Sequence, residues 1–267
     1  MKPKPDSRQV GLARALSKLG YCSRSKAFGL IRAGSVCVNG ASRRDPETPV
    51  HLESDRIEVE GCAVSAKARA YLMLNKPRGV VTTTSDEQGR RTVYDLLGAG
   101  LPWVAPVGRL DKASEGLLLL TNDSEWAAQA SAPATHLEKI YHVQINRLAE
   151  DSLLSCLQEG VRTPDGAFLR VKRACRLRHG GRNSWIEVVL EEGKNRQIRR
   201  LLQSLEIEVL RLVRVAIGPL AMGELAKGSY REITPEEKRS LDAAMKPIRP
   251  VRSAPGRERQ LRKPNPS

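Results

Sequence analysis

Residues 106–123 have the sequence PVGRLDKASEGLLLLTND. The unbroken apolar run Leu117 to Leu120 predicts a buried strand, and Asp111 lies in the loop that leads into it. Arg109 and Lys112 flank this carboxylate and would hold it in place by charge-assisted hydrogen bonds. A carboxylate held in this way can act as a nucleophile or as a general base. Taken alone, Arg-Leu-Asp fits an Asp that caps a turn equally well.

Strand-like segments lie on both sides of this stretch. Alternating or β-branched residues predict strands at 71–76, 80–84, 185–190 and 209–215. Thr92 is a candidate cap for a short helix, and the spacing of Ile198, Leu201, Leu202 and Leu205 predicts another helix. Strands outnumber helices and short loops such as 164–166 join them, so we expect an α+β fold with a mostly antiparallel sheet.

A small module is expected at the N-terminal end of the chain. Apolar residues recur at helical spacing between Leu12 and Leu19, and Gly20 provides a stop. Ser23 is a good N-cap for a second helix that ends at Gly34. Short strands are predicted at 36–38 and 55–59, and Asn39-Gly40 after the first of them is a strong turn signal. Two helices and a small sheet would make a compact unit.

The net charge of the chain limits the kinds of partner that it is expected to bind. It has 267 residues, with 45 Lys and Arg against 30 Asp and Glu, for a net charge of +15. Such an excess favours a polyanionic partner, with nucleic acid the first candidate and an anionic membrane surface the second. The plain alternative is a soluble protein from a lineage that favours basic sequences.

The cysteines and histidines give no sign of a metal or disulfide framework. Five cysteines are widely spaced without a CxxC pair, and four histidines show no metal-ligand spacing. We therefore expect no metal site and a reducing cytoplasmic setting. No apolar run approaches the length that a membrane span needs, so no membrane association is expected.

The stretch 106–123 closely resembles the catalytic motif of the bacterial pseudouridine synthases that act on ribosomal RNA. Residues 138–143 and 192–201 resemble the second and third motifs of the same family. The resemblance implies that Asp111 is the essential catalytic residue, that Tyr141 stacks on the target base, and that Arg199 pairs with Asp111. It also implies a mixed central sheet with an RNA cleft and a small RNA-binding domain on a flexible tether.

The N-terminal module resembles the alpha-L RNA-binding domain that was first named for a small-subunit ribosomal protein. The resemblance makes five basic residues on its helices candidates for RNA contact: Arg14, Lys18, Arg24, Lys26 and Arg32. Around the catalytic motifs the candidates are Arg109, Lys139, Lys194, Arg196 and Arg200, although Arg196 and Arg200 could be structural instead. Each could also be an ordinary solvated side chain, but phosphate contacts add up and tolerate imprecise geometry.

The predicted organisation has three parts. They are an alpha-L domain at 9–65, a pseudouridine synthase domain at 68–245 and a disordered basic tail at 246–267. The expected activity is the isomerisation of a uridine in ribosomal RNA or a pre-ribosomal particle. Thr82 to Thr84 and Lys194 to Gln197 favour the enzymes of the large ribosomal subunit over those of the small one. The reaction adds and removes no atoms, so no cofactor is expected, and a monomer is the default for the family.

Two other classes of protein remain as alternatives. A noncatalytic RNA-binding or ribosome-assembly protein would keep the fold and lose Asp111, Tyr141 or Arg199, yet all three are present. A DNA-binding or membrane-surface protein would need a base-reading helix or a basic amphipathic helix with aromatic anchors. Aromatic residues make up only 4% of the chain, and neither kind of helix is evident.

Overall fold

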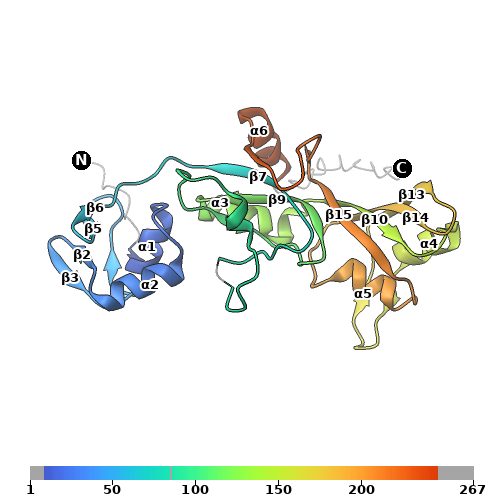
Figure 1. Cartoon of the computed structure of the whole chain (residues 1–267), viewed down its shortest axis with the longest axis horizontal. Helices are drawn as coiled ribbons and strands as arrows, with labels where there is room; N and C mark the ends of the chain where they lie inside the picture. The colour runs from blue at the N-terminus through green and yellow to red at the C-terminus, as the bar shows by residue number, and fades with distance from the viewer. Residues whose placement is uncertain (1–8, 85, 246–267) are drawn as a thin grey trace, which may run out of the picture.

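The computed structural model describes residues 9–84 and 86–245, so the predicted tail at 246–267 lies outside the described residues. The N-terminal module lies at one end of the molecule, coloured blue in Figure 1. Its helices are α1 (Leu12–Lys18) and α2 (Arg24–Ala33), and its four-stranded sheet has the order β3 (Ala41–Arg43), β2 (Val36–Val38), β5 (Ile57–Val59) and β6 (Cys62–Ala63). A two-stranded ladder joins β1 (Val10–Gly11) to β4 (Pro49–Val50).

Local signals account for this module. The Ser23 hydroxyl accepts a hydrogen bond from the backbone N–H of Lys26 at 3.1 Å and so caps α2. Gly34 ends α2 in the left-handed region at φ 82°. Asn39 and Gly40 both have positive φ and turn β2 into β3. The predicted pair of helices with a small sheet is therefore confirmed.

The second module is built on a nine-stranded sheet. Its main path runs β13 (Arg173–His179), β14 (Ser184–Leu190), β10 (Lys139–Ile145), β15 (Val209–Ile217), β9 (Glu115–Thr121), β7 (Tyr71–Lys76) and β17 (Tyr230–Glu232). Strand β8 (Ala105–Val107) pairs with β9, and β16 (Leu220–Ala221) pairs with β15. The pair β9–β15 is parallel, whereas the other pairs along this path are antiparallel, so the predicted mixed and mostly antiparallel sheet is confirmed.

Helices and short elements complete the second module. The helices are α3 (Ser124–Ser131), α4 (Asp151–Glu159), α5 (Gln197–Gln203) and α6 (Pro235–Ala244), with 3-10 turns η1 (Val93–Leu96) and η2 (Pro133–Thr135) and the small ladder of β11 (Val161–Arg162) with β12 (Phe168–Leu169). Figure 1 shows α3 and α6 near the centre of the molecule and α4 and α5 toward the end opposite the N-terminal module. None of the helices among the described residues is long and apolar enough to span a bilayer.

Strand β9 is the centre of the core, and this explains its four consecutive leucines. All seven of its residues are buried. Leu117 and Leu119 pack with Trp126 of α3 and Leu241 of α6, whereas Leu118 and Leu120 pack in a separate cluster on the other face of the sheet. A strand covered on both faces needs apolar side chains at successive positions rather than at alternate ones.

One predicted strand is wrong. Residues 80–84 form no strand among the described residues: Val81 makes a single bridge to Thr92, and Thr82 turns toward the loop of residues 108–114, which precedes β9. There the Thr82 hydroxyl donates a hydrogen bond to the carbonyl oxygen of Leu110 at 2.8 Å. The β-branched composition that predicts a strand is here used to brace a loop, because β propensity depends on the surroundings. The helix predicted after Thr92 is the 3-10 turn η1, which Thr92 caps.

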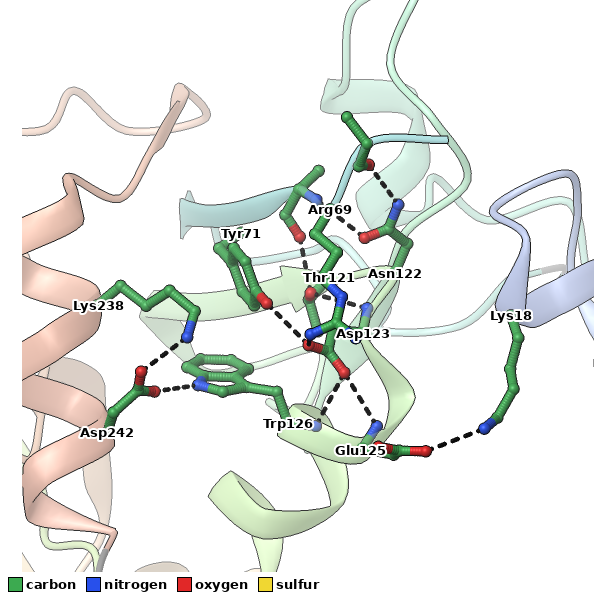
Figure 2. A network of polar contacts seen from close by, with 12 residues as sticks. Lys18, Arg69, Tyr71, Thr121, Asn122, Asp123, Glu125, Trp126, Lys238 and Asp242 are labelled. Carbon is green, nitrogen blue, oxygen red and sulfur yellow. Dashed lines mark hydrogen bonds and ion pairs between the residues drawn. The ribbon is translucent and has the colours of Figure 1, made fainter. Parts of the chain in front are cut away.

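Hydrogen bonds hold the segment that joins the two modules, rather than leaving it as the free tether that the family resemblance implies. Lys67 N–H donates to the Leu19 carbonyl at 3.1 Å, and the Asn122 side chain binds both Ala68 and Ala70. Figure 2 shows Arg69 paired with Asp123, 2.8 Å apart, beside the start of α3. In the same view Lys18 of the N-terminal module reaches Glu125 of α3 at 3.0 Å. The two modules are thus directly linked through side chains.

Candidate active site

A cleft of about 620 Å³ opens in the second module beside the loop of residues 108–114, which holds Asp111. Residues from the loop before β9, from β10, from β15 and from the segment that leads into α5 line it. Among the residues predicted from the sequence, six line this cleft: Arg109, Asp111, Lys139, Tyr141, Lys194 and Arg196. Segments that are far apart in the chain therefore converge on one site, with a carboxylate, an aromatic ring and several cations around it.

The Asp111 carboxylate lies at the cleft with about a third of its side chain exposed. Its Oδ2 is 3.5 Å from Nη1 of Arg196. The neighbouring cations Arg109 and Lys112 are exposed and make no ion pair with it in the described part of the chain, so the predicted clamp by sequence neighbours is wrong. A turn closed by Ser114 N–H on the Asp111 carbonyl, at 3.0 Å, shapes the loop.

Arg199 does not reach the Asp111 carboxylate, which corrects the pairing expected from the sequence. Its guanidinium donates to the carbonyl oxygens of Ala113 at 3.0 Å and Val209 at 3.3 Å. Burial, followed by the nearby charge of Arg196, lowers the pKa of Arg199, and the charge of Asp111 opposes this shift without a direct contact. Arg196 reaches the carboxylate because it precedes α5 in the left-handed region, at φ 48°, and so does not follow the spacing of the helix faces. Arg199 thus braces the loop of residues 108–114 against β15.

Lys76 also holds this loop, although it was not among the residues predicted from the sequence. Its side chain is fully buried at the end of β7. Its ammonium donates to the carbonyl oxygens of Asp111 at 3.1 Å, Ser114 at 2.8 Å and Pro77 at 3.1 Å. Burial, with a smaller contribution from Arg214, lowers the pKa of Lys76 to about 8. The available signal was a lysine that ends a predicted strand with the apolar run Leu72 to Leu74.

The lowered pKa of Lys76 predicts how the free energy of unfolding changes with pH. The pKa of Lys76 in the folded protein, about 8, is below its ordinary value of 10.5, so the folded state binds fewer protons than the unfolded state between these values. The charge of Lys76 therefore weakens folding below pH 8, and this penalty fades as the pH rises toward 10.5. Relative to Lys76→Met, the free energy of unfolding of the wild type should rise over this window by on the order of 2 kcal/mol.

Urea unfolding of both proteins from about pH 7 to about pH 10 measures this difference. Lys112→Met, which removes an exposed lysine from the same loop, is the control and should track the wild type at every pH. A difference between wild type and Lys76→Met that stays constant with pH would contradict the assignment of the shifted pKa to Lys76.

Tyr141 lies on β10 with its ring half-buried at the cleft. It packs against two apolar clusters, one that includes residues of β10 and β14 and one that includes residues of β7 and β9. Across the β10–β15 ladder its partner is Arg214. A ring fixed in this way offers a rigid surface on which a displaced pyrimidine could stack.

The other basic residues predicted to contact RNA are of two kinds: exposed side chains, and side chains that are partly buried or form ion pairs. On the N-terminal module Arg14, Arg24, Lys26 and Arg32 are exposed, whereas Lys18 is largely covered and paired with Glu125. Near the cleft Lys194 pairs with Glu192 at 2.8 Å, and Lys139 is partly buried. Arg200 pairs with Asp165 at 2.6 Å and does not line the cleft. Sequence alone did not separate these cases.

Comparison with known proteins places the chain in a family. The model of the RNA pseudouridylate synthase family matches residues 70–204, and that of the S4 domain matches residues 10–57. An uncharacterized RNA pseudouridine synthase of Rickettsia prowazekii is 40% identical over 84% of this chain and 94% of its own length. The ribosomal large subunit pseudouridine synthase B of Bacillus subtilis is 35% identical over 87% of this chain and 95% of its own.

A solved structure supports the same family assignment. A crystal structure of a pseudouridylate synthase superposes with a TM-score of 0.61 at 28% identity, and covers 87% of this chain and 99% of the other. A match over 87% of the chain is longer than the second module alone, so it extends over both modules. This chain therefore belongs to the family of RNA pseudouridine synthases, with an S4 domain ahead of its catalytic domain.

Proposed function

We propose that this enzyme converts a uridine in the ribosomal RNA of the large subunit into pseudouridine, with Asp111 as its catalytic residue. The observation that carries the proposal is the meeting of Asp111, Tyr141 and Arg196 at one cleft, from three segments that are distant in sequence. The 35% identity to a ribosomal large subunit pseudouridine synthase supports the choice of substrate. Free ribosomal RNA and a pre-ribosomal particle both fit this assignment.

The reaction breaks the bond between ribose C1′ and uracil N1, turns the base, and joins C1′ to C5. The C5 proton is lost and N1 gains one, so the product is an isomer of the substrate. The Asp111 carboxylate either attacks the substrate or abstracts a ribose proton, and its position at the cleft suits both roles. Tyr141 stacks on the uracil after it leaves the helix, which replaces the stacking that the base loses.

The S4 domain adds affinity for the same RNA. We take it as residues 9–65 and the catalytic domain as residues 68–245, acting as a monomer. Its exposed cations Arg14, Arg24, Lys26 and Arg32 can contact phosphates, although the Arg32 guanidinium already lies over the Phe28 ring, 6.0 Å from its centroid. Each such contact releases counterions and thereby adds to the salt dependence of binding.

Because Lys18 is paired with Glu125, we expect it to contribute less to RNA binding than the exposed Arg24. Arg24→Ala should weaken RNA binding and reduce the slope of log K against log salt by about 0.7–0.9, because one phosphate contact is lost. Lys18→Ala should leave the slope nearly unchanged, because the Lys18 ammonium is engaged with Glu125. Fluorescence titrations of both variants with a ribosomal RNA fragment at several salt concentrations measure the slopes. Equal slopes for the two variants would contradict this expectation.

Pseudouridine mapping of total ribosomal RNA tests the proposed function as a whole. A strain that lacks the gene should lose pseudouridine at a position of the large-subunit RNA, and the wild-type gene should restore it. Loss at a small-subunit position would overturn the assignment of the substrate. An unchanged map would overturn ribosomal RNA as the substrate and direct the search to other RNAs.

A further inference from the structure

One of the three arginines that line the cleft has a buried nitrogen without a hydrogen-bond partner in the described part of the chain. Arg214 of β15 lines the cleft and is only 5% exposed. Its Nε donates to the carbonyl oxygen of Leu117 at 2.7 Å, but its Nη2 is buried without a hydrogen-bond partner among the described residues. A buried, unpaired donor on a charged group costs free energy, so a fold that keeps one needs a compensating use for it.

The strand pairing places Arg214 beside Tyr141, on which the target base is expected to stack. In the antiparallel ladder of β10 and β15 it lies directly opposite Tyr141, so both side chains are on the same face of the sheet. The register shifts between Ile140 and Tyr141, which marks a β-bulge at this point. Bulges near active sites commonly re-aim a side chain.

Strand β9, which follows the loop that holds Asp111, lies on the other side of Arg214. Gly116 of β9 pairs with Arg214, and a Cβ atom on Gly116 would lie 2.2 Å from the Arg214 carbonyl oxygen. Only glycine permits so close an approach. This pairing brings β9, and with it the loop that holds Asp111, next to Arg214, and Asp111, Tyr141 and Arg214 all line the cleft.

The charges around Arg214 are unbalanced. Lys76 and Lys139 are close enough that the positive charge of Arg214, together with the larger effect of burial, lowers the pKa of each. The nearby carboxylates are already engaged: Glu115 with Arg211 and Lys227, and Asp111 with Arg196. A surplus of buried positive charge favours negative charge that develops in the cleft.

We propose that Arg214 is a further catalytic residue, which donates a hydrogen bond to a carbonyl oxygen of the target uracil. When the C1′–N1 bond breaks, its electron pair stays with the base, and the negative charge spreads onto O2 and O4. A guanidinium beside the stacked ring stabilises that anion until C5 forms the new bond to C1′, the C5 proton leaves and N1 is protonated. The inference rests on the proposed function, and it holds for either role of Asp111.

Single-turnover kinetics with saturating RNA test this role. The substrate is a ribosomal RNA fragment that the wild type modifies. Arg214→Gln should lower the rate constant by about 10²–10³-fold, the usual loss when one donor to a developing anion is removed. The dissociation constant for the RNA should change by less than about threefold, because the effect falls on the transition state. Arg178→Gln, which removes an exposed arginine of β13 outside the cleft, should match the wild type in both.

Arg214→Lys guards against failure of the Gln variant to fold. It keeps the charge and loses the fork of donors, so a folded Arg214→Lys protein should be slower than wild type by about tenfold or more at unchanged affinity. A wild-type rate constant in a folded Arg214 variant overturns the inference. So does a loss confined to affinity and its salt dependence, which would mark a phosphate contact instead. If the wild type itself forms no pseudouridine in any ribosomal RNA fragment, the proposed function fails, and the inference fails with it.

Discussion

Asp111→Asn is expected to lower the rate of pseudouridine formation by at least about 10³-fold. The amide has the shape of the carboxylate, but it neither attacks as a nucleophile nor accepts a proton at neutral pH. The loop should keep its conformation, because Lys76 and Arg199 hold it through the backbone carbonyls of Asp111, Ala113 and Ser114 rather than through the carboxylate. RNA affinity should therefore stay close to that of the wild type.

Pseudouridine mapping in a complemented deletion strain and single-turnover assays on purified protein measure this loss. Asp151→Asn is the matched control, since Asp151 is an exposed carboxylate at the start of α4 that pairs with Arg176. It should retain normal turnover. Near-normal turnover in a folded Asp111→Asn protein would remove Asp111 from the catalytic role.

Gly116→Ala is expected to destabilise the fold by about 3 kcal/mol or more, for two separate reasons. Gly116 has a φ of 101°, a backbone conformation that residues with a Cβ rarely adopt. Its new Cβ would also lie 2.2 Å from the Arg214 carbonyl oxygen, which belongs to a neighbouring strand and cannot rotate away. The parallel pairing of β9 with β15 at the centre of the sheet would have to open.

Gly100→Ala separates the two reasons. Gly100 has a similar φ of 90°, but nothing lies within 4 Å of its Cβ position. It should cost only about 1 kcal/mol, the backbone cost alone. Urea unfolding of both variants measures the difference, which we expect to be at least about 2 kcal/mol. Equal losses would show that β9 and β15 are free to separate at this point.

The parts of the fold that the sequence predicted are those set by local chemistry. Ser23 and Gly34 bound α2 through capping that depends only on neighbouring residues, and Asn39-Gly40 makes its turn in the same way. The leucines of β9 are buried on both faces, which is what an unbroken apolar run requires. The strand predicted at 80–84 failed because its β-branched residues brace a loop in the folded chain, as Thr82 does on Leu110.

The sequence also predicted some residues of the candidate site correctly and assigned others the wrong partner. Motif resemblance selected Asp111 and Tyr141, and the structure brings both to the cleft, where their roles remain proposals. It gave the wrong partner for Asp111, because Arg196 stands outside the helix on which Arg199 lies. Lys18 was grouped with the free cations although Glu125 of the other module engages it.

The sequence by itself determined the family and the two modules, and it selected Asp111 and Tyr141 as candidates, because these depend on short-range periodicity, capping and continuous motifs. Only the tertiary structure decided which cation meets the carboxylate, that Lys76 is buried beneath the loop, and that Arg214 faces the cleft opposite Tyr141. Strand order and the register between distant strands set these contacts. Both depend on the packing of the whole sheet, which no local pattern encodes.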